Sequence, residues 1–481
     1  MGVQDHLQNA FYIGGEWVAP STTRSFELIN ASTEEVIGSV PEAMEADVDR
    51  AVAAARKALE SGAWAQATPN ERAEIMHRFA ASLAKRSDAI ARAVSVQNGM
   101  PLAVSTGLEG QFGAGLMQYY AELARSQGTD EVRPSQVGKE TRVSRDPIGV
   151  VAGIVPWNFP VTLALSKIAP AMAAGCTLVM KPSPGTVLDS YIVAEAAAEA
   201  GVPAGVVNWV AADREVGAYL VSHPGVDKVA FTGSTAAGRI IARVCGELLR
   251  PVTLELGGKS AAIILDDADL NAVMQGLPQV AMLNNGQTCF NCTRILAPQS
   301  KYEQVLEAMA GLMGALKVGD ALDADTHVGP MASALHRDRV QGYIEKGKSE
   351  ARLIAGGGKP GTDRGWFVQP TVFADDHNNT TVGREEIFGP VLTVIPYKDD
   401  ADAVRLANDS IYGLGGSVWG SDPDRASKVA RQVQTGTIGI NGYIPAVGSP
   451  FGGVKASGLG REFGPEALSG YQQYKSTYVM G

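Results

Sequence analysis

The sequence predicts an α/β protein that contains two α/β domains and a small β element. Three observations support this fold class: the chain has 481 residues, 45% of them are hydrophobic, and short β-rich runs alternate with helical patterns. One hydrophobic core rarely serves so long a chain, because domains typically contain about 150 residues. Strands that alternate with helices are typical of βαβ units, which form a parallel sheet.

Charge and hydropathy exclude some classes of partner. Lys and Arg together number 41 and Asp and Glu 51, which gives a net charge of −10 at pH 7. This balance disfavours binding to nucleic acid or to an anionic membrane surface, so we expect neither partner. The most apolar stretch, 149–165, is broken by Pro156 and Pro160 and therefore does not suit a membrane span.

The cysteine content indicates the compartment. Four cysteines in so long a chain do not form a disulfide framework: Cys176, Cys245, Cys289 and Cys292. The amino-terminal residues also carry no targeting signal that we can identify. We therefore expect a reducing, cytoplasmic compartment.

The first part of the chain predicts two packed helices followed by a hairpin. Apolar residues recur at helical spacing over 47–60. Thr68 and Glu71 have the spacing of a capping box, with Pro69 at the first helical position, so a second helix begins there. The stretch 127–145 is polar with little helical signal, and we expect a protruding hairpin.

The middle of the chain predicts a Rossmann-like sheet. Short β-rich runs alternate with helical patterns, with strands at 150–155, 177–180, 206–210, 228–231 and 252–256, and helices at 161–174, 187–200, 214–221 and 236–244. A second alternation follows over 302–436. We therefore place the boundary between the two domains near Gly257 and Gly258.

Three motif matches do not support the function that each suggests. The G-x-G-x-x-G match at 356–361 contains Pro360 and reads as a turn. The P-loop match at 342–349 has the helical interior YIEK and no strand before it. Cys289 and Cys292 form a single C-x-x-C, and the six histidines lie far away in sequence, so we expect no metal site.

Four segments contain reactive residues, and the last three of them also contain glycines: 156–160, 231–235, 254–259 and 285–289. Each alone has an ordinary structural explanation, because tryptophans pack, Gly-Gly pairs form turns and internal cysteines fill cores. Together they supply a thiol, a carboxylate, a carboxamide and a glycine-flanked turn between a strand and a helix. These groups suit nucleophilic chemistry on a carbonyl beside a dinucleotide.

The segments also resemble those of the aldehyde dehydrogenase superfamily, in its NAD(P)-dependent, non-acylating form. The resemblance covers nearly the whole chain, and further motifs occur in the family's order at 11–17, 385–390, 450–453 and 457–462. It implies the aldehyde dehydrogenase fold, with a Rossmann-like dinucleotide-binding domain, an α/β catalytic domain and a small β oligomerisation element. It also implies NAD(P)+-dependent oxidation of an aldehyde to a carboxylic acid.

The resemblance assigns roles to the reactive residues. Cys289 would attack the aldehyde, and the Asn158 amide and the Cys289 N–H would hold the oxyanion of the thiohemiacetal. Glu255 would be the general base that hydrolyses the thioester; its alternative is a solvated charge at the end of a strand. Lys167 is carried over as a proton-relay partner, with an exposed helical charge as its alternative. Glu462 is a second candidate relay.

The resemblance also implies a nicotinamide cofactor. The expected cofactor-binding residues are Ile154, Trp157, Lys181, Gly233, Ser234, Leu256, Glu386 and Phe388. Ser234 begins a helix, and the N–H groups of a helix start favour phosphate. Pro184 stands where many NAD-preferring members carry a glutamate, which leaves NADP open. We expect NAD, because no arginine clamp for a 2′-phosphate is evident.

The residues that the resemblance places around the aldehyde are uncharged: Phe159, Leu163, Ser166, Thr288, Phe290 and Tyr443. They favour an apolar aliphatic or aromatic aldehyde over a semialdehyde, whose carboxylate needs a cation. Packing alone also explains Phe290. The alternatives are a CoA-acylating enzyme, which Glu255 argues against, a semialdehyde dehydrogenase and a non-catalytic relative.

The carboxyl-terminal tail, 471–479, is predicted to form a strand with aromatic residues. We expect another segment to pair with this strand, because an unpaired edge strand is prone to aggregation. In the family this tail joins the polar hairpin at the subunit contact, so we expect a homodimer or a homotetramer. The domains follow from these elements. We assign 1–126 and 148–256 to dinucleotide binding, 257–470 to catalysis, and 127–147 with 471–481 to oligomerisation.

Overall fold

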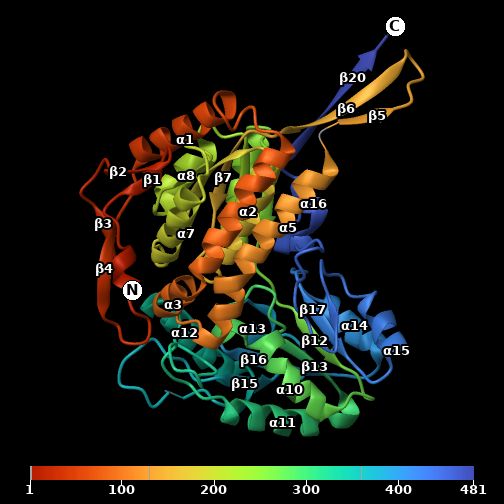
Figure 1. Cartoon of the computed structure of the whole chain (residues 1–481). Helices are drawn as coiled ribbons and strands as arrows, with labels where there is room; N and C mark the ends of the chain where they lie inside the picture. The colour runs from red at the N-terminus through yellow and green to blue at the C-terminus, as the bar shows by residue number, and fades with distance from the viewer. Residues whose placement is uncertain (1–2, 129, 359, 481) are drawn as a thin grey trace.

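The computed structural model describes residues 3–128, 130–358 and 360–480. Two large sheets with their helices form the body, and a third, narrow sheet projects from it (Figure 1). The first sheet has the order β19-β11-β10-β7-β8-β9-β1-β2. Its strands are β1 (Phe11–Ile13), β2 (Glu16–Val18), β7 (Val150–Ile154), β8 (Thr177–Lys181), β9 (Val207–Trp209), β10 (Lys228–Thr232), β11 (Val252–Glu255) and β19 (Gly458–Leu459).

The five central strands run parallel, as the Rossmann-like layout predicts. Almost every residue in them is buried, because helices cover a parallel sheet on both faces. The helices of this half are α1 (Glu45–Glu60), α2 (Pro69–Lys85), α3 (Ser87–Asn98), α4 (Leu102–Ser105), α5 (Phe112–Gln127), α6 (Pro160–Ala174), α7 (Leu188–Glu199), α8 (Arg214–Ser222) and α9 (Thr235–Glu247). The capping box predicted at Thr68 and Glu71 is present at the start of α2.

The second sheet has the order β14-β15-β16-β13-β12-β17-β18. Its strands are β12 (Ala261–Ile264), β13 (Arg294–Pro298), β14 (Arg352–Ala355), β15 (Thr371–Ala374), β16 (Val391–Tyr397), β17 (Gly416–Trp419) and β18 (Gly439–Ile440). Its helices are α10 (Leu270–Ala281), α11 (Tyr302–Ala315), α12 (Ala334–Glu350), α13 (Thr381–Arg384), α14 (Asp400–Asn408) and α15 (Pro423–Ala430). The P-loop match at 342–349 lies inside α12, so its prediction as a helix is confirmed. In the match at 356–361, Lys359 lies outside the described residues.

The chain passes from the first sheet to the second between Glu255 and Ala261, next to the predicted boundary. Part of the later chain returns: β19 pairs with β11, and α16 (Gly464–Ser469) packs against α6. Both sheets therefore meet around the end of β11. This return matters for function because it brings residues near 460 to Glu255.

The third sheet consists of β5 (Asp130–Arg133), β6 (Glu140–Pro147) and β20 (Gln472–Val479). The predicted hairpin and the predicted pairing of the tail with it are both confirmed, and the three strands project from the body in Figure 1. A separate two-stranded sheet joins β3 (Ser25–Ile29) to β4 (Val36–Pro41). Among the helices of the described ranges, none is long and apolar enough to span a bilayer.

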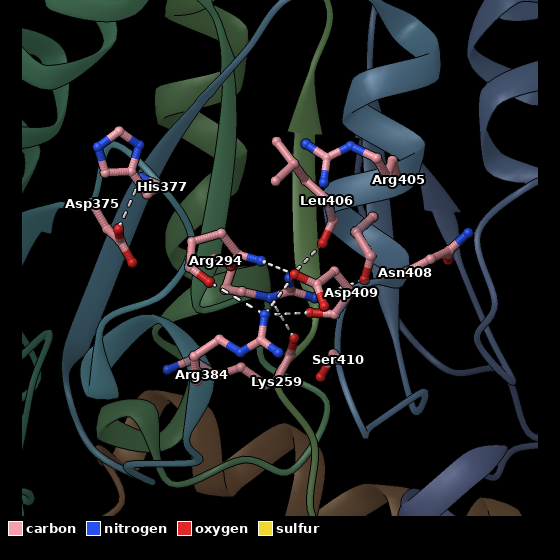
Figure 2. A network of polar contacts seen from close by, with 12 residues as sticks. Lys259, Arg294, Asp375, His377, Arg384, Arg405, Leu406, Asn408, Asp409 and Ser410 are labelled. Atoms are coloured by element: carbon pink, nitrogen blue, oxygen red, sulfur yellow. Dashed lines mark hydrogen bonds and ion pairs between the residues drawn. The ribbon is translucent and has the colours of Figure 1, made fainter.

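A buried arginine holds the second sheet to one of its helices. Arg294, the first residue of β13, donates to the carbonyls of Leu406 and Ala407 at 2.8 Å each and of Lys259 at 3.0 Å (Figure 2). Leu406 and Ala407 lie in the last turn of α14, where carbonyls have no partner within the helix. A cation there also complements the helix dipole. Arg294 therefore fixes α14 and the segment after Gly258 to the strand that follows Cys289.

Candidate active site

Cys289 lies in the loop between η3 (Leu283–Gly286) and β13. Gly258 packs against it so closely that a Cβ at position 258 would lie 2.4 Å from the Cys289 carbonyl oxygen. Burial raises the pKa of the Cys289 thiol, and the carboxylates of Glu386 and Glu255 raise it further. The backbone N–H groups of Cys289 and Phe290 lower that pKa, because they stabilise the thiolate.

Glu255 ends β11 and is only 2% exposed, so its alternative interpretation as a solvated charge is wrong. Neither carboxylate oxygen has a hydrogen-bond partner among the residues that the structure describes. Burial raises the pKa of Glu255 well above its ordinary value, and Glu462 adds to the shift, whereas Lys167 and Arg461 oppose it. A buried, unpaired carboxyl group of this kind is suited to take a proton from water.

Asn158 precedes α6 and is buried. Its side-chain Nδ2 donates to the Gln287 carbonyl at 2.9 Å, which brings the amide to the loop of Cys289. Its own carbonyl accepts from Asn98 at 3.0 Å and from Asn284 at 2.9 Å. Asn158, the predicted oxyanion donor, is thus held by hydrogen bonds to its backbone. Its side chain contacts Gln287, which precedes Cys289 by two positions in the sequence.

Lys167 lies in α6 and is 0% exposed, so its alternative as a surface charge is wrong. Its Nζ forms an ion pair with Glu462 at 2.6 Å and donates to Thr232 Oγ1 at 2.7 Å. Ser166 Oγ donates to Glu462 at 2.9 Å, which places this residue in the polar network rather than among the apolar side chains. The network acts on Glu255 electrostatically, because the charges of Glu462 and Lys167 shift the pKa of the Glu255 carboxyl group.

The predicted cofactor residues gather at the carboxyl ends of the first sheet, where α/β folds bind ligands. Ile154 and Lys181 end β7 and β8, and Gly233 with Ser234 joins β10 to α9. Ser234 caps α9, with its Oγ accepting from Ala237 N. Lys181 Nζ is held by the Ala212 carbonyl at 2.8 Å, and burial lowers its pKa to about 8.

Glu386 lies where the two sheets meet. Its Oε1 accepts from Gly258 N at 2.9 Å, and burial raises its pKa to about 6. A Cβ at Gly257 would lie 2.2 Å from Glu386 Oε2, so a side chain at this position would displace the carboxylate. Leu256, which is buried, fixes the adjoining backbone by donating its N–H to the Ser457 carbonyl at 2.9 Å.

An aromatic cluster adjoins Glu386. Trp157 and Phe388 have ring centroids 5.5 Å apart, and Phe388 has a φ of 65°, which is unusual for a residue with a side chain. His336 completes the cluster, with its ring 5.0 Å from Trp157 and its Nε2 2.7 Å from the Phe388 carbonyl. Burial lowers the pKa of His336 to about 4, so the ring is neutral and donates.

Sequence reasoning did not single out His336 or Arg339, which donates to the Glu386 carbonyl at 2.9 Å. Both lie on α12, in a region that the sequence marks only by helical periodicity. Neither has a motif of its own, and only the fold brings them to Phe388 and Glu386.

The predicted substrate side chains form an apolar wall. Phe290 packs edge-on against Tyr443 with ring centroids 5.2 Å apart, and against Phe451 at 6.0 Å. Phe159 is buried and Leu163 half-buried. The hydroxyl of Thr288 is occupied by the Leu283 carbonyl at 2.8 Å. Phe290 therefore packs as its structural alternative predicted, and does so beside Cys289.

The residues present fit a dinucleotide. Gly233 N donates to the Glu255 carbonyl at 3.0 Å, which places the turn between β10 and α9 beside the end of β11. A helix of 13 residues starts at this turn, and its first N–H groups suit a pyrophosphate. Glu386 and Lys181 supply a carboxylate and an amine for ribose hydroxyls. Without side chains, Gly257 and Gly258 leave room for Glu386 and for the Cys289 loop.

Comparison with known proteins identifies the class. The model of the aldehyde dehydrogenase family matches residues 17–477. A geranial dehydrogenase from Castellaniella defragrans is 60% identical over 470 residues, which is 98% of each chain. The chain therefore belongs to the aldehyde dehydrogenase family, and it is an oxidoreductase that acts on aldehydes.

Solved structures agree. An aldehyde dehydrogenase of Mycobacterium tuberculosis complexed with NAD+ is 46% identical with a TM-score of 0.95, over 98% of each chain. A mutant aldehyde dehydrogenase C of Pseudomonas syringae, in a complex with NAD+ and octanal, is 37% identical with a TM-score of 0.94, over 98% of this chain and 97% of that one. The predicted fold class is thereby confirmed.

Proposed function

We propose that this chain oxidises an uncharged, apolar aldehyde to its carboxylic acid, with NAD as the hydride acceptor and Cys289 as the nucleophile. One observation carries the proposal: the buried, unpaired carboxyl group of Glu255 lies close enough to Cys289 for its charge to raise the thiol pKa. A nucleophile beside a base with a raised pKa is the arrangement that acyl transfer to water requires.

In the first step, the Cys289 thiol gives its proton to a water molecule, and its sulfur attacks the carbonyl carbon. A C–S bond forms, and the π electrons of the C=O bond move to oxygen. The Asn158 amide and the Cys289 N–H are the donors for the resulting oxyanion. The Asn158 amide is already aimed at the Cys289 loop, because it donates to Gln287.

NAD, when bound, would accept the hydride that leaves the former aldehyde carbon; the electron pair of the oxyanion then re-forms the C=O bond, and the acyl group stays on Cys289 as a thioester. Ser234, Lys181 and Glu386 bind the cofactor at its phosphates and riboses, and Trp157 with Phe388 lines its nicotinamide end. Glu386 is held in place by Gly258 N, and Arg339 holds its backbone. These residues orient the cofactor against Cys289. Pro184 offers no carboxylate to repel a 2′-phosphate, and the assay below therefore compares NAD with NADP.

In the second step, Glu255 takes a proton from water, and the oxygen attacks the thioester carbon. The C–S bond then breaks, the Cys289 thiolate leaves, and the carboxylic acid is released. Lys167 and Glu462 are the proposed route for this proton, because they form a buried ion pair whose charges act on the Glu255 carboxyl group. Release to water rather than to coenzyme A follows from the presence of this base.

The substrate is an aliphatic aldehyde without charge. Phe159, Leu163, Phe290 and Tyr443 offer no cation for a carboxylate, which argues against a semialdehyde. The relatives named for geranial and complexed with octanal act on or bind long apolar aldehydes, which fits the same wall.

We also propose that the chain works as a homodimer or a homotetramer in the cytoplasm, with residues 1–126 and 148–256 binding NAD and 257–470 carrying Cys289. The sheet of β5, β6 and β20 supports oligomerisation, since Val132, Tyr474 and Tyr478 are exposed on it. The four cysteines are free thiols, which suits a reducing compartment.

The decisive experiment is an initial-rate assay of reduced cofactor with aliphatic, aromatic and semialdehyde substrates, each with NAD and with NADP. We expect NAD-dependent turnover that is fastest with apolar aliphatic aldehydes. Cys289→Ala should abolish turnover and leave NAD binding intact, while Cys292→Ser, the matched control, should keep wild-type rates. An active Cys289→Ala enzyme, or a preference for semialdehydes, would contradict the proposal.

A further inference from the structure

The start of α6 has no cap of its own. Phe159 occupies the N-cap position without a side-chain hydrogen bond to the helix, and Pro160 has no N–H to offer. The N–H of Leu163 bonds to the Phe159 carbonyl at 2.9 Å. Two N–H groups of the first turn, those of Val161 and Thr162, therefore need acceptors from elsewhere.

Glu109 supplies both acceptors from another helix. Its Oε2 accepts from Val161 N at 2.8 Å, and its Oε1 accepts from Thr162 N at 3.3 Å. The link is reinforced in the other direction, because the Thr162 hydroxyl donates to the Leu108 carbonyl. Glu109 is completely buried, and burial raises its pKa to about 8, whereas the hydrogen bonds from Val161 and Thr162 favour its charged form.

An irregular turn carries Glu109 to this position. Residues Thr106–Gln111 form a π-helix between α4 and α5, and π-turns within helices occur frequently at functional sites. The turn is packed closely on its other side: a Cβ at Gly110 would lie 2.6 Å from the Ser87 carbonyl oxygen. The backbone is thus held in a form that directs Glu109 at α6.

The first turn of α6 positions groups on both sides of it. Asn158 lies just before the helix, and its amide is the proposed oxyanion donor. Leu163 lies one turn into the helix at the substrate wall, and Lys167 follows one turn later. A shift of the first turn would therefore move the amide away from the reacting oxygen, and catalysis is sensitive to displacements of about 1 Å.

We propose that Glu109 is a positioning residue for the oxidation, because it fixes the first turn of α6 and, through that turn, the Asn158 amide. The proposal rests on the proposed function. It gives Glu109 no contact with the aldehyde or with NAD, and we expect its effect on the rate to act through the Asn158 amide.

The test is a double-mutant cycle of Glu109→Gln with Asn158→Ala, with rates expressed per active site after titration of Cys289. Glutamine keeps the shape but offers one acceptor oxygen for two N–H groups. We expect Glu109→Gln to lower kcat about tenfold and to leave KM for NAD within about twofold. In the Asn158→Ala background the same change should cost less than about twofold, because the group it positions is gone.

Thr162→Val provides a second variant, which removes only the hydroxyl bond to the Leu108 carbonyl and leaves the helix start capped by Glu109. It should lower kcat by about two- to fivefold and be silent in the Asn158→Ala background. Gln111→Ala, an exposed change in the same π-helix, is the matched control and should keep wild-type kcat.

Wild-type kcat in Glu109→Gln and Thr162→Val would overturn the proposal, and so would losses that multiply fully with the loss from Asn158→Ala. If Glu109→Gln does not fold, Thr162→Val decides by itself. A wild-type enzyme that oxidises no aldehyde would instead contradict the proposed function, so the two failures are distinguishable.

Discussion

Lys167 and Glu462 lie 295 residues apart in the sequence and form an ion pair of 2.6 Å that solvent does not reach. One partner belongs to a helix of the first sheet, and the other follows the strand that returns to that sheet. The pair therefore links the segment after β19 to a helix of the first sheet, next to Glu255.

Removing one partner of the Lys167–Glu462 ion pair is expected to destabilise the folded protein. Lys167→Met leaves the Glu462 carboxylate buried without its counter-ion, which should lower the free energy of unfolding by about 3–5 kcal/mol. Thermal unfolding would measure the loss, and Lys167→Met combined with Glu462→Gln should recover part of it. Lys317→Met removes the exposed partner of Asp325 and is the control, with an expected loss below about 1 kcal/mol. Equal losses in the two lysine variants would contradict a special role for the buried pair.

Replacing Glu255 should separate the two halves of the reaction. Glu255→Gln keeps the shape but removes the base, so the thioester should accumulate after one turnover. Stopped-flow absorbance should show a burst of about one reduced cofactor per site, followed by turnover lowered about 10²- to 10⁴-fold. Glu247→Gln changes an exposed helical glutamate and should match the wild type. Loss of the burst as well would place Glu255 in the first step.

The pH dependence of Glu255 has a defined sign. Because its pKa is raised in the folded protein, the base is ionised only above that pKa, and the rate of thioester hydrolysis should fall as the pH is lowered through it. The folded state also binds this proton more tightly than the unfolded chain does. The contribution to stability is therefore present at low pH and lost as the pH rises above about 4.5. Glu255→Gln should remove both effects.

Gly257 is expected to control cofactor binding. Gly257→Ala places a methyl group against Glu386 Oε2 and should displace that carboxylate. KM for NAD should rise about tenfold or more, on the expectation that one charge-assisted hydrogen bond contributes about 1.5–3 kcal/mol. Gly246→Ala, at a helical glycine with open space around it, is the control. Alkylation of Cys289 should proceed at the wild-type rate in Gly246→Ala. In Gly257→Ala it should be no slower, because the displaced Glu386 carboxylate no longer raises the pKa of the thiol, and a slower rate there would indicate a disturbance beyond the cofactor site.

Arg294 should be irreplaceable by lysine. A lysine cannot reach the three carbonyls that the planar guanidinium bonds together, so carbonyls at the end of α14 would lose their partners. We expect Arg294→Lys to lower the free energy of unfolding by about 2–4 kcal/mol, measured by thermal unfolding. Arg405→Lys, which alters an exposed pair with Asp402, should change it by less than about 0.5 kcal/mol. A stable Arg294→Lys enzyme would show that water can replace these bonds.

The sequence predicted the fold correctly where its local pattern of strands and helices was strong. The strands from Val150 to Glu255 could be predicted because buried β-branched runs are separated by helical patterns. Glu109, His336 and Arg294 could not be predicted, because each acts on a partner from a distant part of the chain. The π-helix that presents Glu109 differs from an α-helix by hydrogen-bond register alone, and side-chain periodicity does not report that register.

The site was partly predictable for a related reason. Cys289, Glu255 and Asn158 stand next to glycines and prolines that mark unusual backbone, so they attract attention in the sequence. The local sequence does not indicate whether a residue is buried. Lys167 could therefore be an exposed charge or a proton-relay residue, and the structure shows that it is buried.

The pairing of β19 with β11 has a consequence for how the protein matures. The edge of the first sheet beside Glu255 is completed only by Gly458 and Leu459, about 200 residues later in synthesis. At usual ribosomal speeds this delay lasts on the order of 10–40 seconds. Cys289 is synthesised early in this interval, and until its end the nascent chain lacks Glu462 and the backbone that encloses the base. The enzyme therefore gains a working hydrolytic site only when its chain is nearly complete.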